Sequence, residues 1–344
     1  METFFDALLR KAVEQRASDV HLAVGLVPMI RVDGALQPAA SEPVTAEQLD
    51  RVIKAIVSPQ QLERFTSDLE LDTAYHVQGV GRFRVNLHRE KGVPGIVARV
   101  IPAVIPKMAD IAMPDVAYDM ARAKQGLVLV TGPTGQGKST AMAAMVELVN
   151  QEQAANIVTL EDPIEYIFTP AKSIIKQREL GRDMISFAEA LKHALRQDPN
   201  VIMVGEMRDL ETIAAAITVA ETGHLVLATL HTYNAAQSIE RIVDVFPPHQ
   251  QDQVRLQVSN VLRGIISQRL LPKVGGGRVA AREILVNTPA VASMIRENKI
   301  AQLRTTIETG VQFGMRTLEA DLAQLVQAGA ITKEVAEQYI TTKG

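Results

Sequence analysis

A glycine-rich loop followed by Lys-Ser-Thr stands directly after an apolar run, in the sequence VLVTGPTGQGKST at residues 128–140. Glycines let successive backbone amides turn toward phosphate oxygens, Lys138 can reach the β- and γ-phosphates, and the Ser139 hydroxyl can bind Mg²⁺. The helix-prone stretch 140–149 adds a helix N-terminus that attracts anions. A glycine-rich turn that binds nothing would not need Lys138, so we predict a nucleotide site. Its expected binding residues are Gly132, Pro133, Thr134, Gly135, Gln136, Gly137, Lys138, Ser139 and Thr140.

A second group of candidates is the acidic segment LEDPIEY, in which Glu161, Asp162 and Glu165 follow a predicted strand. Ligands of open α/β sheets bind at the carboxyl ends of the strands, and carboxylates there can hold Mg²⁺ or its waters. The alternative is a solvated acidic loop that caps the next element. Beside a phosphate-binding loop, the magnesium role is the favoured interpretation.

A third candidate is Glu206, which follows the apolar strand of DPNVIMVGEMRD and resembles the end of a Walker B element. In-line attack on a γ-phosphate needs a water that a carboxylate holds and polarises, and Glu206 is our candidate for that role. The alternative is a surface glutamate that ends the strand. We interpret the flanking Asp198 and Asp209 as helix caps or supporting groups.

Two histidines lie seven residues apart in ETGHLVLATLHTYNA, so His224 and His231 should stand at opposite ends of one buried strand. A histidine at the carboxyl edge can contact the γ-phosphate or the attacking water, and we predict catalytic roles for both. The alternative is a pair of structural histidines. A zinc site is disfavoured because no other His or Cys stands at ligand spacing.

Four arginines, Arg82, Arg84, Arg89 and Arg99, are the candidates in the first third of the chain. The planar guanidinium suits phosphate, although surface solubility and salt bridges within the domain are equally ordinary roles. Six further arginines are interpreted as surface or interface groups: Arg196, Arg208, Arg241, Arg255, Arg263 and Arg269.

The elements that must position these residues fall into two parts. Helical spacing at 1–16 and 45–66 and two or three strands at 80–101 predict an α+β domain over residues 1–105. A proline-containing segment at 106–117 is predicted to be a linker, and residues 118–344 form the second domain.

Short apolar strands alternate with helices in the second domain, which predicts a doubly wound, parallel α/β sheet. The remaining sequence, at 248–271 and 289–342, is expected to be helical with a β-like interruption at 278–287. The predicted strands are 127–131, 156–160, 201–204 and 225–230, and the predicted helices are 187–196, 209–221 and 234–244.

Composition narrows the functional classes. Of the 344 residues 47% are hydrophobic, the formal net charge is −3, and aromatic residues make up 4%, a balance that disfavours nucleic-acid partners. There is no cysteine, which excludes disulfides and thiolate metal sites and is compatible with a reducing compartment. The first 19 residues have no apolar core of signal-peptide type, and no run of about 18 apolar residues occurs, so we expect a cytoplasmic protein.

Taken together, GPTGQGKST, IVTLEDPIEY, DPNVIMVGEMRD and TGHLVLATLHT resemble the Walker A motif, Asp box, Walker B motif and His box of the type II/IV secretion ATPases. The segments RASDVHLAVGLVPMIRVDG and GRFRVNLHREKGVPGIVARVIP resemble the first domain of the PilT-like retraction ATPases of type IV pili. The resemblance covers about residues 1–320.

This resemblance implies an N-terminal PAS-like domain and a C-terminal RecA-like P-loop ATPase domain, assembled as a hexameric ring with ATP between the two domains. It implies that Lys138 and Ser139 hold phosphates and Mg²⁺, and that Glu165 and Glu206 handle metal and water. The two His-box positions are His224 and His231, and the first-domain arginines that reach the phosphates are Arg84 and Arg99.

The implied activity is ATP hydrolysis that drives pilus retraction and twitching motility, by a homohexamer acting on an inner-membrane platform protein. Assembly ATPases usually have a longer N-terminal region and a four-cysteine zinc module, which this chain lacks. The AIRNLI motif of retraction ATPases is altered, however, with Ala292 and Ser293 in place of Arg-Asn, and the phosphate loop has Gln136 where serine is common. An accessory PilU-like ring subunit, working beside a paralogous retraction ATPase, and a pilus-assembly or type II secretion ATPase therefore stay as alternatives.

Overall fold

The computed structural model describes residues 3–32, 34–101 and 104–341 and divides the chain into two compact units. The first unit contains residues 1–104 and 163–167, and the second contains 105–162 and 168–344. Residues 106–117, which the sequence suggested as a linker, group with the second unit. No helix within the described residues has the length and apolar character needed to cross a bilayer.

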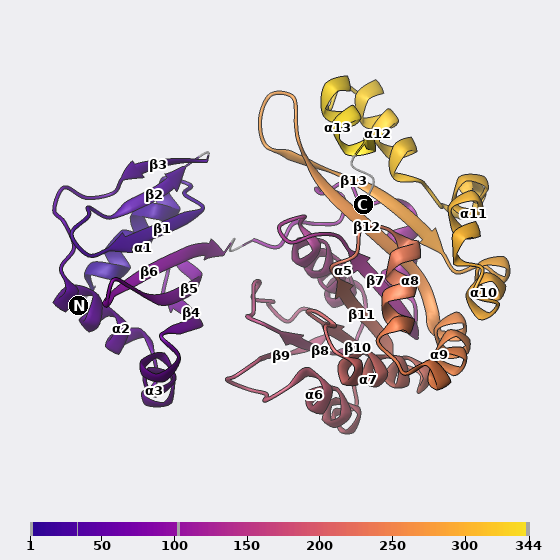
Figure 1. Cartoon of the computed structure of the whole chain (residues 1–344), viewed down its shortest axis with the longest axis horizontal. Helices are drawn as coiled ribbons and strands as arrows, with labels where there is room; N and C mark the ends of the chain where they lie inside the picture. The colour runs from indigo at the N-terminus through magenta and orange to yellow at the C-terminus, as the bar shows by residue number, and fades with distance from the viewer. Residues whose placement is uncertain (1–2, 33, 102–103, 342–344) are drawn as a thin grey trace. The chain divides into compact units, whose positions relative to one another are not determined.

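The first unit is built on a six-stranded antiparallel sheet in the order β3-β2-β1-β6-β5-β4 (Figure 1). Three helices accompany the sheet, and each begins with a Ser or Thr capping box. Phe5, Leu49, Phe65 and Phe83 lie in one buried cluster between helices and strands. The elements are α1 (Phe4–Glu14), β1 (Asp19–Ala23), β2 (Met29–Val32), β3 (Ala35–Pro38), α2 (Ala46–Ile56), α3 (Pro59–Asp68), β4 (Glu70–Val77), β5 (Gly81–Glu90) and β6 (Val93–Ile101).

The second unit is built on a seven-stranded sheet in the order β13-β12-β7-β11-β10-β8-β9. All neighbours are parallel except β13, which runs antiparallel to β12. The strands are β7 (Gly126–Thr131), β8 (Asn156–Glu161), β9 (Ile174–Glu179), β10 (Val201–Val204), β11 (Leu225–Leu230), β12 (Leu262–Pro272) and β13 (Arg278–Val286). The four central strands are almost wholly buried and three of them are largely apolar, as expected for parallel strands covered on both faces.

Helices cover both faces of this sheet (Figure 1). Helix α5 contacts β7 and β11 with α4 beside it, whereas α6 to α9 share a large core with Leu127 and Leu129, the alternate residues of β7. The helices are α4 (Asp115–Arg122), α5 (Lys138–Glu152), α6 (Phe187–Ala194), α7 (Leu210–Glu221), α8 (Ala235–Asp244) and α9 (Pro248–Val261).

The C-terminal part is helical beyond β13, with α10 (Pro289–Arg296), α11 (Leu303–Thr309), α12 (Leu318–Gln327) and α13 (Lys333–Thr341). Short 3₁₀ turns occur at η1 (Leu195–Gln197), η2 (Ile300–Gln302) and η3 (Val311–Phe313). Leu271 of β12 and Ala281 of β13 form a small core with Leu322 of α12 and Ile331. The C-terminal helices are thereby fixed to the β12–β13 end of the sheet.

One predicted element is wrong. Residues 262–271 were expected to continue a helix, but the helix α9 ends at Val261 and β12 begins at Leu262. The apolar residues Leu262, Ile265 and Ile266 recur at a spacing that also fits a helix, but here both neighbours of β12 supply ladder hydrogen bonds. At Gly264, a Cβ would lie 2.7 Å from the Leu285 carbonyl oxygen, so this close strand pairing requires glycine.

Candidate functional site

The glycine-rich loop connects β7 to α5 with three glycines in conformations that favour glycine. Gly132, Gly135 and Gly137 have φ values of 147°, 78° and 77°. Gly137 is the N-cap of α5, and no side chain caps the helix there. The loop therefore enters α5 without a capping side chain, so phosphate oxygens could take the place of a cap.

Close packing against β12 explains why two of these positions exclude a side chain. A Cβ on Gly132 would lie 2.5 Å from the backbone oxygen of Gln268, and one on Gly137 would lie 2.9 Å from the Gln268 Nε2 atom. Both distances are too short for a real Cβ contact. The loop is thus shaped by strand β12 as well as by its own sequence.

Lys138 is buried at the first position of α5, with a relative exposure of 8%. Its Nζ donates to the backbone oxygens of Gly132 and Pro133, at 2.7 and 2.9 Å. The ammonium therefore already lies over the loop, where incoming phosphates would compete with two carbonyl oxygens for it. Ser139 follows half-buried in the first turn of α5, whereas Thr134 and Gly135 are exposed.

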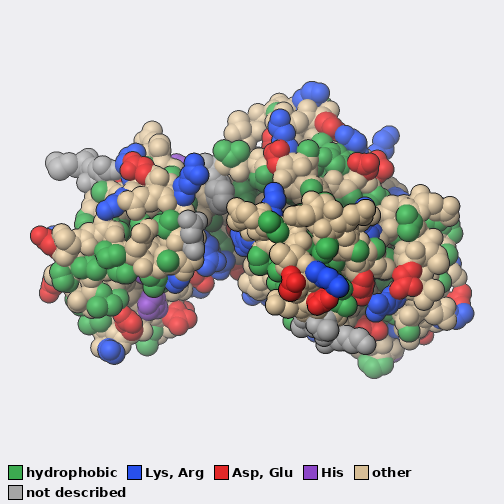
Figure 2. All heavy atoms as spheres, turned by 90° about the horizontal axis from the view of Figure 1, so that it is seen from above, with side chains coloured by type: hydrophobic (Ala, Val, Ile, Leu, Met, Phe, Trp, Pro, Cys, Tyr) green, Lys and Arg blue, Asp and Glu red, His purple; other side chains and the backbone are tan. Residues whose placement is uncertain are grey.

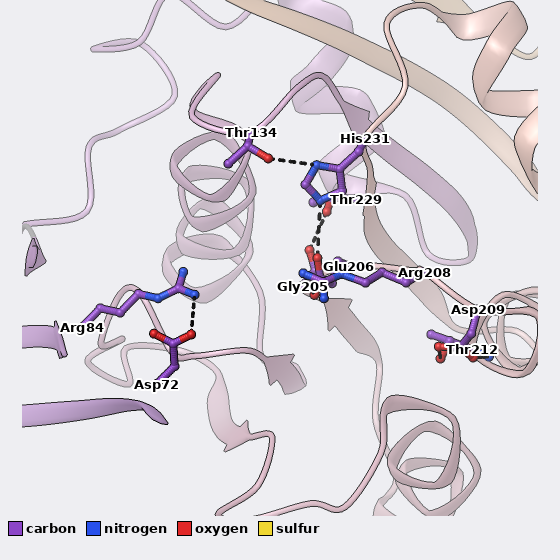
Figure 3. Close-up of polar contacts among 10 residues, drawn as sticks. All are labelled: Asp72, Arg84, Thr134, Gly205, Glu206, Arg208, Asp209, Thr212, Thr229 and His231. Carbon is purple, nitrogen blue, oxygen red and sulfur yellow. Dashed lines mark hydrogen bonds and ion pairs between the residues drawn. The ribbon is translucent and has the colours of Figure 1, made fainter. Parts of the chain in front are cut away.

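Glu206 stands beyond the carboxyl end of β10 in a polar cluster (Figure 3). Its Oε1 lies 2.7 Å from a guanidinium nitrogen of Arg208, its Oε2 lies 3.4 Å from Nε2 of His231, and its side chain is 12% exposed. Thr229 of β11 donates its hydroxyl to the Gly205 backbone oxygen at 2.5 Å, which fixes the turn before Glu206. The carboxylate is thus held in place while part of it stays accessible.

His231 connects this cluster to the phosphate loop (Figure 3). Its Nδ1 lies 3.4 Å from the Thr134 hydroxyl, and its Nε2 faces Glu206. One imidazole therefore contacts both the predicted phosphate loop and the predicted catalytic carboxylate. Because β7, β11 and β10 are parallel neighbours, their carboxyl ends bring these three segments to one edge.

His224 lies at the other end of β11, as its separation of seven residues from His231 predicted. Its Nδ1 lies 3.1 Å from the Thr222 hydroxyl and 3.2 Å from the Val219 backbone oxygen. Val219 lies in the last turn of α7, and Thr222 is the C-cap of that helix. The structure thus separates His224 from the phosphate loop by the length of a strand, and its catalytic role stays a prediction.

The acidic segment after β8 is divided between the two units. Glu161 is buried at the end of β8, where it accepts a hydrogen bond from the Thr159 hydroxyl at 2.6 Å. Asp162 lines a cavity of about 220 Å³ together with Glu206, Arg208 and Asp209. Glu165 groups with the first unit, so its role at the nucleotide stays a prediction.

The donor set fits Mg²⁺ in the way that nucleotide enzymes hold it. No group of three or more His, Asp or Glu side chains within the described residues is arranged to bind a metal ion. Mg²⁺ at a nucleotide needs only one or two protein ligands, because phosphates and water supply the others. The Ser139 hydroxyl, next to Lys138 in the first turn of α5, could provide one such oxygen.

In the first unit, Arg84 and Arg99 are directly opposite each other on the paired strands β5 and β6. Arg84 lies 3.8 Å from the Asp72 carboxylate (Figure 3), and the Arg99 Nε donates to Asp19 at 2.9 Å. Burial opposes ionisation of Asp19, but hydrogen bonds from Ser18 and Arg99 outweigh it and lower the pKa of Asp19. Both arginines thus have carboxylate partners within the unit, and contact with phosphate stays a prediction.

Two residues that contact the candidate site were missed in the sequence analysis. Arg208 was interpreted as a surface or interface group, although it stands two residues after Glu206 and pairs with it. Gln268 was not singled out, because its segment was expected to be helical.

On the face seen in Figure 2, Lys and Arg side chains are interspersed with Asp and Glu, so the charge of that face is mixed.

Comparison with known proteins places these features in context. A family model described as "Type II/IV secretion system protein" matches residues 1–338. The chain is 47% identical over 331 residues to the Pseudomonas aeruginosa type IV pilus retractation ATPase PilT, covering 96% of each protein. It is 40% identical over 333 residues to the type IV pilus ATPase PilU of the same organism, covering 96% of this chain and 87% of PilU.

A crystal structure of the pilus retraction motor PilT with bound ADP matches the fold with a TM-score of 0.90 and 43% sequence identity. The match covers 98% of this chain and 96% of the other. It confirms the mixed α/β fold class that the sequence predicted.

Proposed function

The chain belongs to the type II/IV secretion system protein family, which includes ATPases, and we propose that it is a motor ATPase that drives retraction of type IV pili. Support comes from 47% identity to PilT and from the likeness to an ADP-bound PilT structure. The proposed assembly is a homohexameric ring of PAS-like and RecA-like domains. It would act at the cytoplasmic face of the inner membrane on the pilus platform protein.

The observation that carries the proposal is the position of His231, between Thr134 of the phosphate loop and Glu206. A carboxylate that accepts a proton from water must stand beside the γ-phosphate. Glu206 is suited to this role, because it shares one edge of the sheet with the loop that we predict to hold the phosphates.

In the proposed reaction, water attacks the γ-phosphorus of ATP, its proton passes to Glu206, and the bond to the bridging oxygen breaks to give ADP and phosphate. Lys138 leaves the loop carbonyls for the β- and γ-phosphates. Ser139 and Glu165 would hold Mg²⁺, which neutralises charge on the phosphates when bound. We assign phosphate contacts in the assembled ring to Arg84 and Arg99, and a supporting role to His224.

Hydrolysis would be coupled to movement through closure of domains around the nucleotide. ATP binds both domains in the closed state, and loss of the γ-phosphate removes contacts that favour closure. Repeated around a ring, this cycle supplies mechanical work to the platform protein, so that pilin subunits leave the fibre.

Deletion of the gene tests the retraction role. We expect excess surface pili and loss of twitching, with both restored by the wild-type gene but not by the Lys138→Ala form. Few or no pili in the deletion strain would contradict retraction and support an assembly or secretion role.

A second candidate is an accessory ring subunit that supports a paralogous retraction ATPase. It is favoured by 40% identity to PilU and by the altered motif at Ala292 and Ser293. The two candidate functions can be distinguished by expressing this protein in cells with and without the paralogous ATPase. A principal motor restores retraction in cells that lack the paralogue, whereas an accessory subunit restores it only when the paralogue is present.

A further inference from the structure

Strand β12 extends past the end of its neighbour β7. Beyond that end, the phosphate loop contacts β12 in place of β7. Pairing of the two strands ends at Ser267 and Thr131, although β12 continues to Pro272. The backbone N–H of Leu270 donates to Oε1 of Gln136 at 2.5 Å, and Nε2 of Gln268 donates to the backbone oxygen of Gln136 at 2.6 Å. Gln136 therefore joins the loop to β12 through both its side chain and its backbone.

The Gln268 side chain is buried, with a relative exposure of 3%, and its amide has a defined orientation. Its Oε1 accepts from Nε of Arg282 at 2.9 Å, while its Nε2 donates to Gln136. A guanidinium can only donate and a backbone carbonyl can only accept, so a flipped amide would lose both hydrogen bonds. Arg282 thereby holds Gln268 in the one orientation that serves the loop.

Arg282 is the next link, directly opposite Gln268 on β13 and equally buried. It donates from its two terminal guanidinium nitrogens to the backbone oxygens of Ala112 and Ile111, at 2.9 and 2.8 Å. Burial lowers the pKa of Arg282 to about 10, so the guanidinium stays charged at neutral pH. Five hydrogen bonds thus connect the phosphate loop, β12, β13 and residues 111–112.

Residues 107–113 form a compact turn before α4. Met113 donates its amide to the Met108 oxygen at 2.9 Å, and Ala112 has a φ of 48°, a left-handed conformation uncommon for alanine. The Arg282 guanidinium holds the carbonyls of this turn. In sequence, the turn stands between β6 of the first unit and the body of the second.

The orientation of one peptide plane links this network to phosphate. In a trans peptide the C=O and the following N–H point in opposite directions. Because Gln268 fixes the Gln136 carbonyl toward β12, the Gly137 N–H is directed away from β12. This amide stands at the N-cap of α5, where phosphate would bind.

We propose that Gln268 and Arg282 are positioning residues, which orient the Gln136–Gly137 peptide for phosphate and couple occupancy of the loop to the turn at residues 107–113. The proposal rests on the proposed function, because it requires nucleotide at this loop. It assigns to β12 and β13 a role in nucleotide binding beyond their place in the sheet.

The test uses Gln268→Glu, which keeps the shape and an acceptor for Arg282 but presents an unprotonated oxygen to the Gln136 carbonyl. Loss of one well-oriented hydrogen bond to a charged phosphate predicts roughly ten- to hundredfold weaker ADP binding. The matched control is Ser267→Ala, which removes a buried hydrogen bond between β12 and Thr131 of β7 but leaves Gln136 untouched. It should bind ADP as the wild type does.

Hydrogen exchange at residues 107–113 tests the coupling itself. If Gln268 had only a structural role, its replacement would leave the effect of ADP on this exchange unchanged. Saturating ADP should slow exchange there in the wild type and in Ser267→Ala, but not in Gln268→Glu. Equal slowing in all three proteins, or unchanged ADP affinity in Gln268→Glu, would overturn the proposal. Absence of ADP binding by the wild type would overturn the proposed function as well.

A second variant covers the case in which Gln268→Glu does not fold. Gln268→Met has a similar volume and no charge, and it removes both hydrogen bonds of the amide. The same loss of ADP affinity and of the exchange response is expected. Wild-type values for both in a folded Gln268→Met protein would refute the positioning role.

Discussion

Replacing Glu206 by glutamine separates chemistry from folding at the candidate site. The amide keeps the size of the side chain and can still accept from Arg208, but it cannot take a proton from water. General-base catalysis is worth about 10²- to 10⁴-fold, so the turnover number should fall by that factor, equivalent to about 3 to 5 kcal/mol of barrier. Binding of ATP and ADP should be unchanged.

The expected loss of stability is much smaller. The Arg208 side chain that pairs with Glu206 is 70% exposed, and solvent limits such a pair to about 1 kcal/mol or less. For a unit of this size, that corresponds to a shift in melting temperature of at most about 4 °C. A large fall in turnover with a small shift in melting temperature therefore identifies a chemical role.

The assay is phosphate release by the purified protein at saturating Mg-ATP, with ADP affinity measured in parallel. Glu211→Gln is the matched control, because it makes the same chemical change on the exposed side of α7. We expect wild-type turnover from this control. Turnover within about threefold of the wild type in Glu206→Gln would refute the assignment of the general base, because no effect of the expected size could then be present.

Three further outcomes are expected. Lys138→Ala should lower turnover at least roughly hundredfold and weaken ADP binding in fluorescence titrations, and retained turnover would contradict the phosphate role. Arg99→Ala and Asp19→Asn should both lower the melting temperature by breaking their shared ion pair, but only Arg99→Ala should slow phosphate release; equal turnover in the two would leave Arg99 a purely structural group. Burial raises the pKa of Glu283 above its unfolded value, so its contribution to stability is complete at pH 4 and is lost as pH rises through the folded pKa. Glu283→Gln should therefore melt above the wild type at pH 8, with the difference shrinking toward pH 4 in a calorimetric series, and a constant difference would contradict this titration.

Much of the second unit could be predicted because its local signals agree with its tertiary structure. The strands 201–204 and 225–230 were predicted with the bounds that β10 and β11 have, and helices 209–221 and 234–244 correspond to α7 and α8 within one residue. Parallel central strands are apolar throughout and are separated by helices with capping residues such as Asp209 and Asn234. Each signal needs only a short window of sequence.

Strand β12 could not be predicted in the same way, because its identity depends on partners far away in the chain. Leu262–Pro272 pairs with β7, more than a hundred residues earlier, and with β13 after it. The apolar pattern of Leu262, Ile265 and Ile266 fits a helix as well as a strand. The strand is favoured over the helix because β7 offers an edge with which this segment can pair.

The same reason explains which site residues were found. Lys138 and Glu206 lie within motifs whose spacing has chemical meaning, so they could be identified from sequence. Arg208 was within reach of the same reasoning, since an arginine two residues from the predicted catalytic glutamate can turn back to it. Gln268 and Arg282 stand over 130 positions after the loop in the sequence, and no local pattern connects them to it.

The departures from the retraction-ATPase pattern have different structural meanings. Gln136, where serine is common, reaches the Leu270 amide and so ties the phosphate loop to β12. In α10, Val291 and Ile295 fill the core, whereas Ala292 and Ser293 are half-buried, and Ser293 donates to Glu297 at 2.7 Å. The first departure is accommodated inside the predicted nucleotide site, and the second changes a helix face without changing the fold. The difference between a principal motor and an accessory subunit should therefore be sought in what α10 contacts, and a swap of the AIRNLI residues into α10 should alter pilus retraction while leaving ATP turnover unchanged.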